Sequence, residues 1–242
     1  MQDSPRARQS IGGYVLAGGH SSRMGRDKAL LELGGKPLVQ HAVLKLRRIT
    51  EEVSILGARS ELALIAPLVP DLRENSGPLA GIEAALGHTR HDWILVLPVD
   101  MPFLPTLLLE RWSHSVVEHP TARIAFFTID GLPQPAPCML HREVAPLVAA
   151  AAEQGILKLY SALEAAAAAL AGQHDLPLHQ VVLSKHWEGS TEPDPSLKDS
   201  LGENSWRVLT KAQVAARHLW FANLNTPEEF AEALRYVDAI DT

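Results

Sequence analysis

The sequence predicts an α/β fold of three αβα layers, with helices on both faces of a doubly wound, mostly parallel central sheet. Three observations lead to this prediction. Short apolar segments of strand length alternate with longer segments whose apolar residues recur at helical spacing, which is typical of parallel βαβ units. The run Trp93–Val99 is almost continuously apolar, as expected of a strand covered on both faces. The length of 242 residues suits one domain, so we expect residues 1–242 to form a single unit.

The first half of the chain begins with a predicted strand, Tyr14–Ala17, which ends at the Gly18-Gly19 pair, a signal for a tight turn. Pro37 stands where the first turn of a helix accepts proline, and apolar residues follow it at helical spacing up to Ile49. Further along we expect a strand at Val53–Leu56, an ambiguous apolar segment at Leu62–Val69, a helix at Gly81–Leu86 and a strand at Trp93–Val99.

The second half starts with further alternation of helices and strands. Residues 188–204 hold almost no apolar residue, which predicts a flexible surface loop. Thr226 is a suitable cap for the last helix, with Glu228 and Glu229 in its first turn. The predicted elements are helices at Leu107–Val117, Val144–Ala152, Leu157–Ala171 and Pro227–Val237, and strands at Arg123–Ile129, Ala136–Leu140 and Leu219–Asn223.

Composition and charge exclude several classes of protein. The formal net charge of −6 and the isoelectric point near 6.0 provide no basic stripe, which excludes a nucleic acid partner. The most apolar stretch, Trp93–Leu109, is interrupted by Asp100 and three prolines, so we expect no membrane span. The single cysteine, Cys138, forms no internal disulfide, and Met1–Ser10 lacks a signal-peptide core. These features predict a reducing, cytoplasmic location.

The segment Leu16–Lys28 follows the first strand and combines glycines, hydroxyls and cations, which predicts a phosphate-binding loop. Gly18 and Gly19 let backbone N–H groups approach anionic oxygens, while Arg23 and Lys28 supply positive charge to a polyphosphate. The segment lacks the Gly-Lys-Ser/Thr ending of a P-loop and the glycine spacing of a dinucleotide-binding turn. The alternative is a glycine-rich surface turn with incidental charges.

The same loop resembles the signature of the molybdenum cofactor guanylyltransferases, a family with a Rossmann-like nucleotidyltransferase fold. The family's pattern occurs here as Leu-Ala-Gly-Gly at 16–19, Arg-Met-Gly at 23–25, Asp-Lys at 27–28 and Leu-Gly-Gly-Lys-Pro-Leu at 33–38. Three later segments agree in order and approximate spacing. They are Asp71 with Gly77-Pro78-Leu79-Ala80-Gly81-Ile82, Leu97-Pro98-Val99-Asp100, and Asn223-Leu224-Asn225-Thr226-Pro227.

The resemblance implies that molybdopterin attacks the α-phosphorus of GTP and releases pyrophosphate. It implies GTP and molybdopterin as small-molecule partners, Mg²⁺ held by Asp100, and transient contacts with a molybdoenzyme or chaperone. The expected catalytic residues are Lys28, Asp100 and Arg23. Expected nucleotide contacts are Leu16, Ala17, Gly18, Gly19, Lys28, Asp71, Gly77, Pro78, Leu79 and Asp100, and expected acceptor contacts are Asn223 and Asn225.

General chemistry supports part of this assignment and leaves alternatives open. Asp100 follows an apolar strand, and ligands of doubly wound sheets bind beyond the carboxyl ends of strands. Magnesium needs only one or two carboxylates when substrate phosphates complete its coordination. Asp100 and Asp71 also suit ordinary turns, and Asn223 and Asn225 suit turn or cap positions. The departures from the family pattern, Leu56 and Glu74-Asn75, leave open a related transferase using CTP or a sugar phosphate, or a silent nucleotide-binding module.

Other chemistries find little support in the sequence. The eleven histidines are scattered without the cysteine or carboxylate spacing typical of zinc sites. Ser21 and Ser22 lack a recognisable histidine and acid for a hydrolase triad. Cys138 lies between Pro137 and Met139 in an apolar segment, which favours buried packing over a nucleophilic role.

Overall fold

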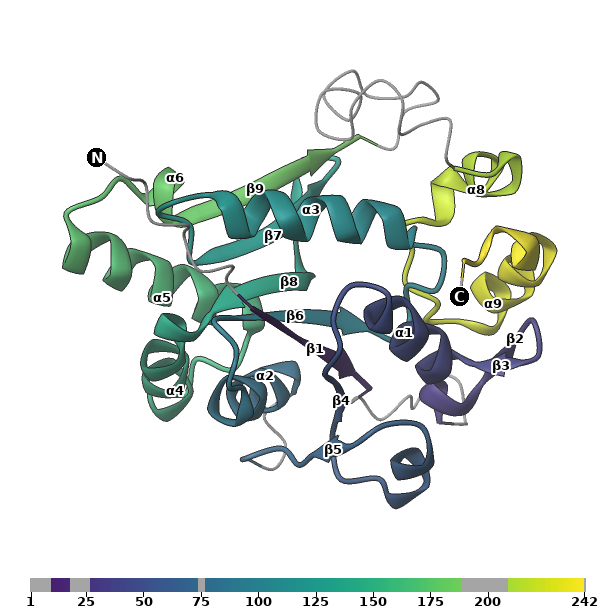
Figure 1. Cartoon of the computed structure of the whole chain (residues 1–242), viewed down its shortest axis with the longest axis horizontal. Coiled ribbons are helices and arrows are strands. Elements are labelled where there is room, and N and C mark those ends of the chain that lie inside the picture. Colours follow the sequence, from purple (N-terminus) through teal and green to yellow (C-terminus); the bar gives the residue numbers. More distant parts are fainter. Residues whose placement is uncertain (1–9, 18–26, 74–76, 189–208, 242) are drawn as a thin grey trace, which may run out of the picture.

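The computed structural model describes residues 10–17, 27–73, 77–188 and 209–241. Within these residues the fold is built on a seven-stranded sheet of order β5-β4-β1-β6-β8-β7-β9. Figure 1 shows the sheet running through the centre of the molecule. The strands are β1 Ile11–Leu16, β4 Val53–Leu56, β5 Leu68–Val69, β6 Trp93–Pro98, β7 Ile124–Ile129, β8 Leu132–His141 and β9 Val182–Trp187.

The sheet is mostly parallel, as predicted. β1 pairs in parallel with β4 on one side and with β6 on the other, and β4 pairs in parallel with β5. The strand β8 runs antiparallel to both of its neighbours, β6 and β7, while β9 pairs in parallel with β7. All strands except β8 therefore point the same way, and their carboxyl ends share one edge of the sheet.

Helices cover both faces of the sheet, which confirms the three-layer prediction (Figure 1). One hydrophobic core packs α1 and α3 with the carboxyl-terminal segment, and a second packs α2, α4 and α5 on the opposite face. The described helices are α1 Leu38–Arg47, α2 Pro78–His88, α3 Thr106–Glu118, α4 Ala145–Glu153, α5 Leu159–His174, α6 Leu178–Val181, α8 Lys211–Ala215 and α9 Pro227–Ala233.

Most predicted elements are confirmed within a few residues, but some details differ. Pro37 precedes α1 as its N-cap and pairs with Glu32 in a small hairpin that the sequence did not predict, formed by β2 (Glu32–Leu33) and β3 (Lys36–Pro37). The ambiguous segment Leu62–Val69 contains part of a 3₁₀ turn and the strand β5. The predicted loop 188–204 lies outside the described residues except for Glu188.

The predicted strand Leu219–Asn223 is wrong. Leu219 ends a 3₁₀ turn, and Trp220 has helical backbone angles. Its indole is 1% exposed and donates a hydrogen bond to the Gln213 carbonyl at 3.0 Å. Phe221 packs against Trp187 and Phe127, with ring centroids 5.4 and 4.9 Å apart. The run is apolar because it packs beside the sheet, and apolar character alone does not distinguish this from strand pairing.

The predicted last helix, Pro227–Val237, is only partly correct. Thr226 caps α9 as expected, and its hydroxyl accepts from the Glu229 N–H while the Glu229 side chain accepts from the Thr226 N–H. The α-helix ends at Ala233, and a 3₁₀ segment, Leu234–Ala239, continues with non-helical angles at Tyr236. No helix in the described ranges is long and apolar enough to cross a membrane.

One buried ion pair anchors the carboxyl-terminal end of the described chain. The Lys45 side chain on α1 is 1% exposed and pairs with Asp241, and the other carboxylate oxygen of Asp241 accepts from the Thr106 N–H at 2.9 Å. Burial lowers the pKa of Lys45 below its ordinary value, with the Asp241 charge acting in the opposite direction. Asp241 thus joins α1 to the first turn of α3.

We predict that Asp241→Asn destabilises the protein by about 3 kcal/mol, because it leaves a buried lysine without its counter-charge while keeping an acceptor for Thr106. The loss should shrink as the pH rises towards the ordinary lysine pKa of 10.5, since deprotonation removes the buried charge. Chemical denaturation measures both effects. Adding Lys45→Met should recover most of the lost stability, and equal stability of Asp241→Asn and wild type would contradict the assignment.

Candidate functional site

The site is built at the carboxyl edge of the three adjacent parallel strands β4, β1 and β6. Their register places Leu56, Leu16 and Pro98 side by side as the last residues of these strands. The residues that follow each strand therefore begin at the same level of the sheet. Ligands of doubly wound sheets bind at this edge, which agrees with the predicted position of Asp100.

Lys28 joins two of the predicted site residues. Its ammonium donates to Asp100 Oδ2 at 2.8 Å and to Asn225 Oδ1 at 2.7 Å. The Lys28 and Asp100 side chains are 13% and 21% exposed, so the pair is largely shielded from water. An ammonium has three N–H donors, and these two bonds leave one that can point to an anionic ligand. The structure thus brings together three residues that are far apart in the sequence.

Local hydrogen bonds fix Lys28 and Asn225 from both directions. Asp27 caps the short 3₁₀ turn Lys28–Leu30, because its Oδ1 accepts from the Ala29 N–H at 3.0 Å. On the other side, Glu229 Oε2 accepts from the Asn225 N–H at 2.6 Å. The Leu224 N–H donates to the Asp100 carbonyl at 3.0 Å, which ties the carboxyl-terminal segment to the end of β6. Both partners of the ammonium are therefore held by backbone contacts.

Asp100 has one carboxylate oxygen that suits a cation. Its Oδ1 is buried and accepts no hydrogen bond from the described residues. A buried carboxylate oxygen without a donor is costly, and a divalent cation is a ligand that would compensate it. No group of three or more His, Cys, Asp or Glu suitable for a metal occurs in the described part of the chain. A cation at Asp100 would therefore need ligands other than the described carboxylate, imidazole and thiol side chains to complete its coordination.

The start of α2 and Asp71 form the neighbouring part of the same edge. Gly77 is the N-cap of α2 with a φ of 60°, and Pro78 and Leu79 form the first turn. Asp71 lies in the exposed segment before this helix, yet desolvation raises the pKa of its carboxyl group. Its Oδ1 and the Leu56 side chain lie so close to Gly81 that an added Cβ would be 3.3 Å from both.

The other predicted site residues make fewer contacts at this edge or lie outside the described residues. Leu16 and Ala17 lie at the end of β1, and the Leu16 carbonyl accepts from the Val99 N–H at 3.2 Å. The Asn223 side chain is partly exposed and makes no hydrogen bond to a described residue, unlike Asn225. Three predicted residues lie outside the described residues: Gly18, Gly19 and Arg23.

Arg59 is a residue at this edge that the sequence analysis missed. It follows β4 by three positions, and its guanidinium contacts both Asp27 Oδ2 and the Ala17 carbonyl. No motif marks Arg59 in the sequence. The rule that polar residues beyond parallel strands gather at one edge, applied to the predicted strand Val53–Leu56 as it was to Trp93–Val99, would have identified it.

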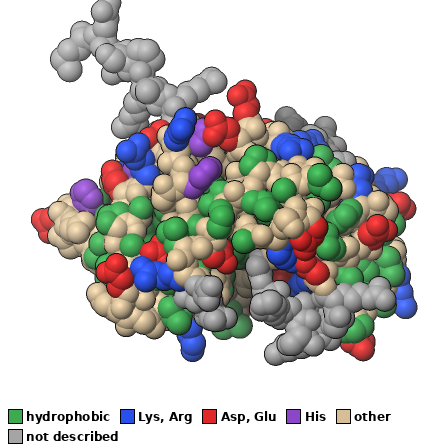
Figure 2. All heavy atoms as spheres, turned by 90° about the horizontal axis from the view of Figure 1, so that it is seen from below, with side chains coloured by type: hydrophobic (Ala, Val, Ile, Leu, Met, Phe, Trp, Pro, Cys, Tyr) green, Lys and Arg blue, Asp and Glu red, His purple; other side chains and the backbone are tan. Residues whose placement is uncertain are grey.

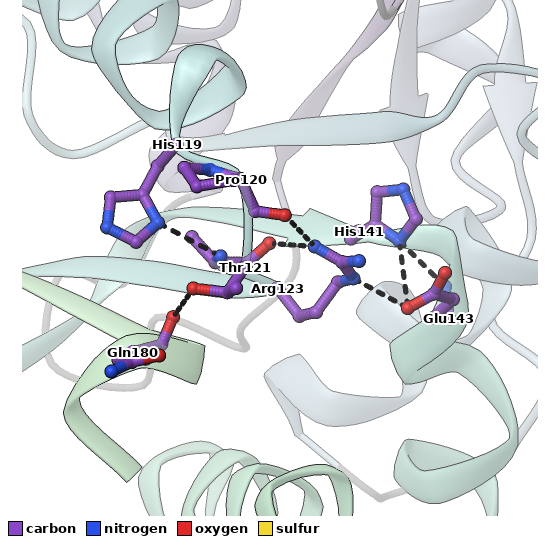
Figure 3. A network of polar contacts seen from close by, with 8 residues as sticks. His119, Pro120, Thr121, Arg123, His141, Glu143 and Gln180 are labelled. Carbon is purple, nitrogen blue, oxygen red and sulfur yellow. Dashed lines mark hydrogen bonds and ion pairs between the residues drawn. The ribbon is translucent and has the colours of Figure 1, made fainter. Parts of the chain in front are cut away.

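The opposite edge of the sheet holds a separate polar network (Figure 3). Arg123 Nε donates to Glu143 at 2.6 Å, and its Nη1 donates to the Ala122 carbonyl at 2.7 Å. Burial is the main cause of the lowered pKa of His141 in this network. These contacts join the start of β7 to the end of β8 and satisfy backbone carbonyls, as a structural network does. Cys138 is fully buried, as its predicted packing role requires, and burial raises the pKa of its thiol to about 12.

Charged side chains of both signs are interspersed with apolar ones on the described surface that Figure 2 shows. This distribution agrees with the modest formal net charge of −6.

Comparison with known proteins identifies relatives of the chain. The family model described as MobA-like NTP transferase domain matches residues 13–181. The molybdenum cofactor guanylyltransferase of Serratia proteamaculans is 33% identical over 170 residues, which cover 66% of this chain and 82% of that protein. The enzyme of the same name from Vibrio cholerae is 36% identical over 150 residues, covering 60% of this chain and 72% of that protein.

A solved structure supports the fold. Molybdopterin-guanine dinucleotide biosynthesis protein A from Archaeoglobus fulgidus superposes with a TM-score of 0.62 at 22% identity, covering 93% of this chain and 97% of that one. A 2-C-methyl-D-erythritol 4-phosphate cytidylyltransferase from Thermus thermophilus superposes with a TM-score of 0.55 at 15% identity, covering 95% and 99%. At these identities the two structures establish the shared α/β fold.

Two glycines of α2 provide a matched test of the packing around Asp71. Gly87→Ala should stabilise the protein by about 0.5 kcal/mol, because alanine favours helix and the new Cβ would lie more than 4 Å from every described atom beyond its chain neighbours and the backbone of its own helix. Gly81→Ala should lose this gain, because its Cβ presses on Leu56 and Asp71. Chemical denaturation of both variants measures the difference. An equal gain from both substitutions would show that the contacts around Gly81 are not tight.

Proposed function

Because the chain belongs to the MobA-like NTP transferase family, we propose that it transfers GMP from GTP to the phosphate of molybdopterin. The products are pyrophosphate and the guanine dinucleotide form of the cofactor. The observation that carries this proposal is the cluster of Lys28, Asp100 and Asn225 at the carboxyl edge of the sheet, whose residues lie within the motifs of the guanylyltransferases. The similarity to those enzymes over most of their length supplies the reaction.

The chemistry explains why the cluster contains a cation and a carboxylate but no histidine. In the transfer, an oxygen of the acceptor phosphate forms a bond to the α-phosphorus of GTP, and the bond from the α-phosphorus to the bridging oxygen breaks as pyrophosphate leaves. The second pKa of a phosphate monoester is about 6, so this nucleophile is largely deprotonated at pH 7 and needs no protein base. The protein must align two anions and reduce their mutual repulsion.

We assign the residues of the site to these tasks. Lys28 binds a phosphate oxygen with its third N–H and offsets the negative charge as the two substrates approach. Asn225, with its neighbour Asn223, contacts the acceptor. Arg23 adds a second cation to the polyphosphate. The nucleotide is held by Leu16, Ala17, Gly18, Gly19, Asp71, Gly77, Pro78 and Leu79.

We further propose Asp100 as the protein ligand of Mg²⁺. The buried Oδ1, which accepts no hydrogen bond from the described residues, fits this role, and its partner Oδ2 is held by Lys28. When bound, the cation would neutralise phosphate charge and polarise the reacting phosphorus. Lys28 keeps the Asp100 carboxylate in one orientation, so Oδ1 is already positioned to accept the cation before any ligand binds.

Pyrophosphate release tests the proposed function. We expect pyrophosphate release with GTP only when molybdopterin is present. Release with CTP, ATP or UTP should be much lower, because the relatives that the chain resembles are named guanylyltransferases. Sugar phosphates serve as the acceptor control. Faster release with CTP would make the chain a cytidylyltransferase of the same fold, and no release with any triphosphate would make it a binding module.

A substitution at Asp100 tests the metal assignment. Asp100→Asn should lower kcat by about 100-fold or more, because the amide cannot replace a carboxylate that holds a cation. The matched control is Asp175→Asn, which removes the same charge at an exposed residue with a φ of 52°, a conformation that asparagine tolerates. Mg²⁺ titrations of pyrophosphate release compare both variants with wild type. Wild-type turnover of Asp100→Asn at equal Mg²⁺ would refute the assignment.

A further inference from the structure

We infer that Arg59 is a positioning residue, which sets the place of Lys28 by holding Asp27 against the end of β1. The activity part of this inference rests on the function proposed above. The structural part stands on contacts among the described residues alone. Arg59 belongs to the loop after β4, a different strand from the one that precedes Lys28.

The guanidinium of Arg59 connects the two described residues that flank positions 18–26. Its Nη2 donates to the Ala17 carbonyl at 2.6 Å, and its Nη1 pairs with Asp27 Oδ2. One rigid, planar group thus fixes the backbone where β1 ends and the side chain that precedes Lys28. Lysine cannot make both contacts in the same way, because its ammonium is a single point at the end of a flexible chain.

Asp27 passes this constraint on to Lys28. The carboxylate oxygen that does not face Arg59 accepts from the Ala29 N–H at 3.0 Å and caps the turn that begins at Lys28. Lys28 therefore lies between two residues whose positions depend on the same carboxylate. From this backbone its side chain reaches Asp100 and Asn225. A shift of Asp27 would move the ammonium relative to both partners.

The solvent exposure of the Arg59 and Asp27 side chains indicates that their ion pair positions Lys28 more than it stabilises the fold. The Arg59 and Asp27 side chains are 30% and 27% exposed, so water screens their attraction and the pair adds little to folding stability. Catalysis is much more sensitive, because a displacement of about 1 Å in a reacting site can cost about 100-fold in rate. Arg59 variants should therefore fold normally and still lose turnover.

The test is a double-mutant cycle. Arg59→Gln and Asp27→Asn each remove the link between the two side chains, and asparagine keeps an acceptor for the Ala29 N–H. We expect each to lower kcat by about 10- to 100-fold, with a smaller change in the KM for GTP and an unchanged melting temperature. The double variant should fall no further than the worse single variant, because both act through one contact. Arg59→Lys should not restore turnover.

The matched control is Arg47→Gln. Arg47 also donates to a backbone carbonyl, that of Ile65 at 3.0 Å, but it lies on α1 and forms no hydrogen bond or ion pair with Asp27, Lys28 or Asp100 in the described chain. Its kcat should equal that of wild type. Losses that add in the double variant would show that Arg59 and Asp27 act independently, which would overturn the inference. Full turnover of Arg59→Gln or rescue by Arg59→Lys would also overturn it.

Amide exchange of Ala29 gives a readout that needs no substrate. In the ligand-free protein, Arg59→Gln should raise the exchange rate of this amide by about tenfold or more, because its acceptor is no longer held, while Arg47→Gln leaves it unchanged. If wild type releases no pyrophosphate from GTP and molybdopterin, the proposed function fails, and the exchange result alone decides the positioning role. Unchanged exchange of Ala29 in Arg59→Gln would then overturn it.

Discussion

The Lys28 ammonium is the contact on which the rest of the site depends, since it joins the end of β6 to the carboxyl-terminal segment. Asp100 and Asn225 lie 72 and 197 positions from Lys28 in the chain. A different part of the fold positions each residue. The register of β1 with β6 places Asp100 near Lys28, and the capping box of α9 places Asn225 there. The ammonium can bind both because the sheet and the helix end are held independently of it.

Four charged groups at this edge form two ion pairs before any ligand is bound. Lys28 pairs with Asp100, and Arg59 pairs with Asp27. The Lys28–Asp100 pair lowers the cost of keeping two ionised groups largely shielded from water. Both pairs also hold each side chain in one orientation, which is what a reaction between two anions requires from the protein. Polyphosphate binding would then need small adjustments of groups already in place.

Sequence patterns predict the fold well where burial determines the backbone. Trp93 to Pro98 is buried along its whole length, and its apolar run was recognised as a strand. The strand β9 was missed because Ser184, Lys185 and His186 interrupt its apolar character at the edge of the sheet. The apolar run Leu219–Asn223 predicts a strand, but Trp220 and Phe221 are apolar because they pack through ring contacts beside the sheet.

Local sequence patterns also predict only part of the candidate site. Asp100 is expected from its place after a strand, and the same rule applied to Val53–Leu56 would identify Arg59, whereas Asn225 follows only from family resemblance. The contacts of Asn225 and Arg59 depend on three-dimensional positions that no local pattern encodes, namely the docking of α9 and the neighbouring ends of β1 and β4.

The family match and the site do not cover the same part of the chain. The family match ends at residue 181, yet Asn225, which lies after that residue, accepts a hydrogen bond from the Lys28 ammonium. This later segment is anchored by its own interactions, the buried Trp220 indole and the Lys45–Asp241 ion pair. The side of the site that we propose for the nucleotide is therefore built by the sheet, and the side that we propose for the acceptor is built by a segment that packs against the sheet. Because the two sides meet at Lys28, the docking of the carboxyl-terminal segment is itself a condition for a complete site.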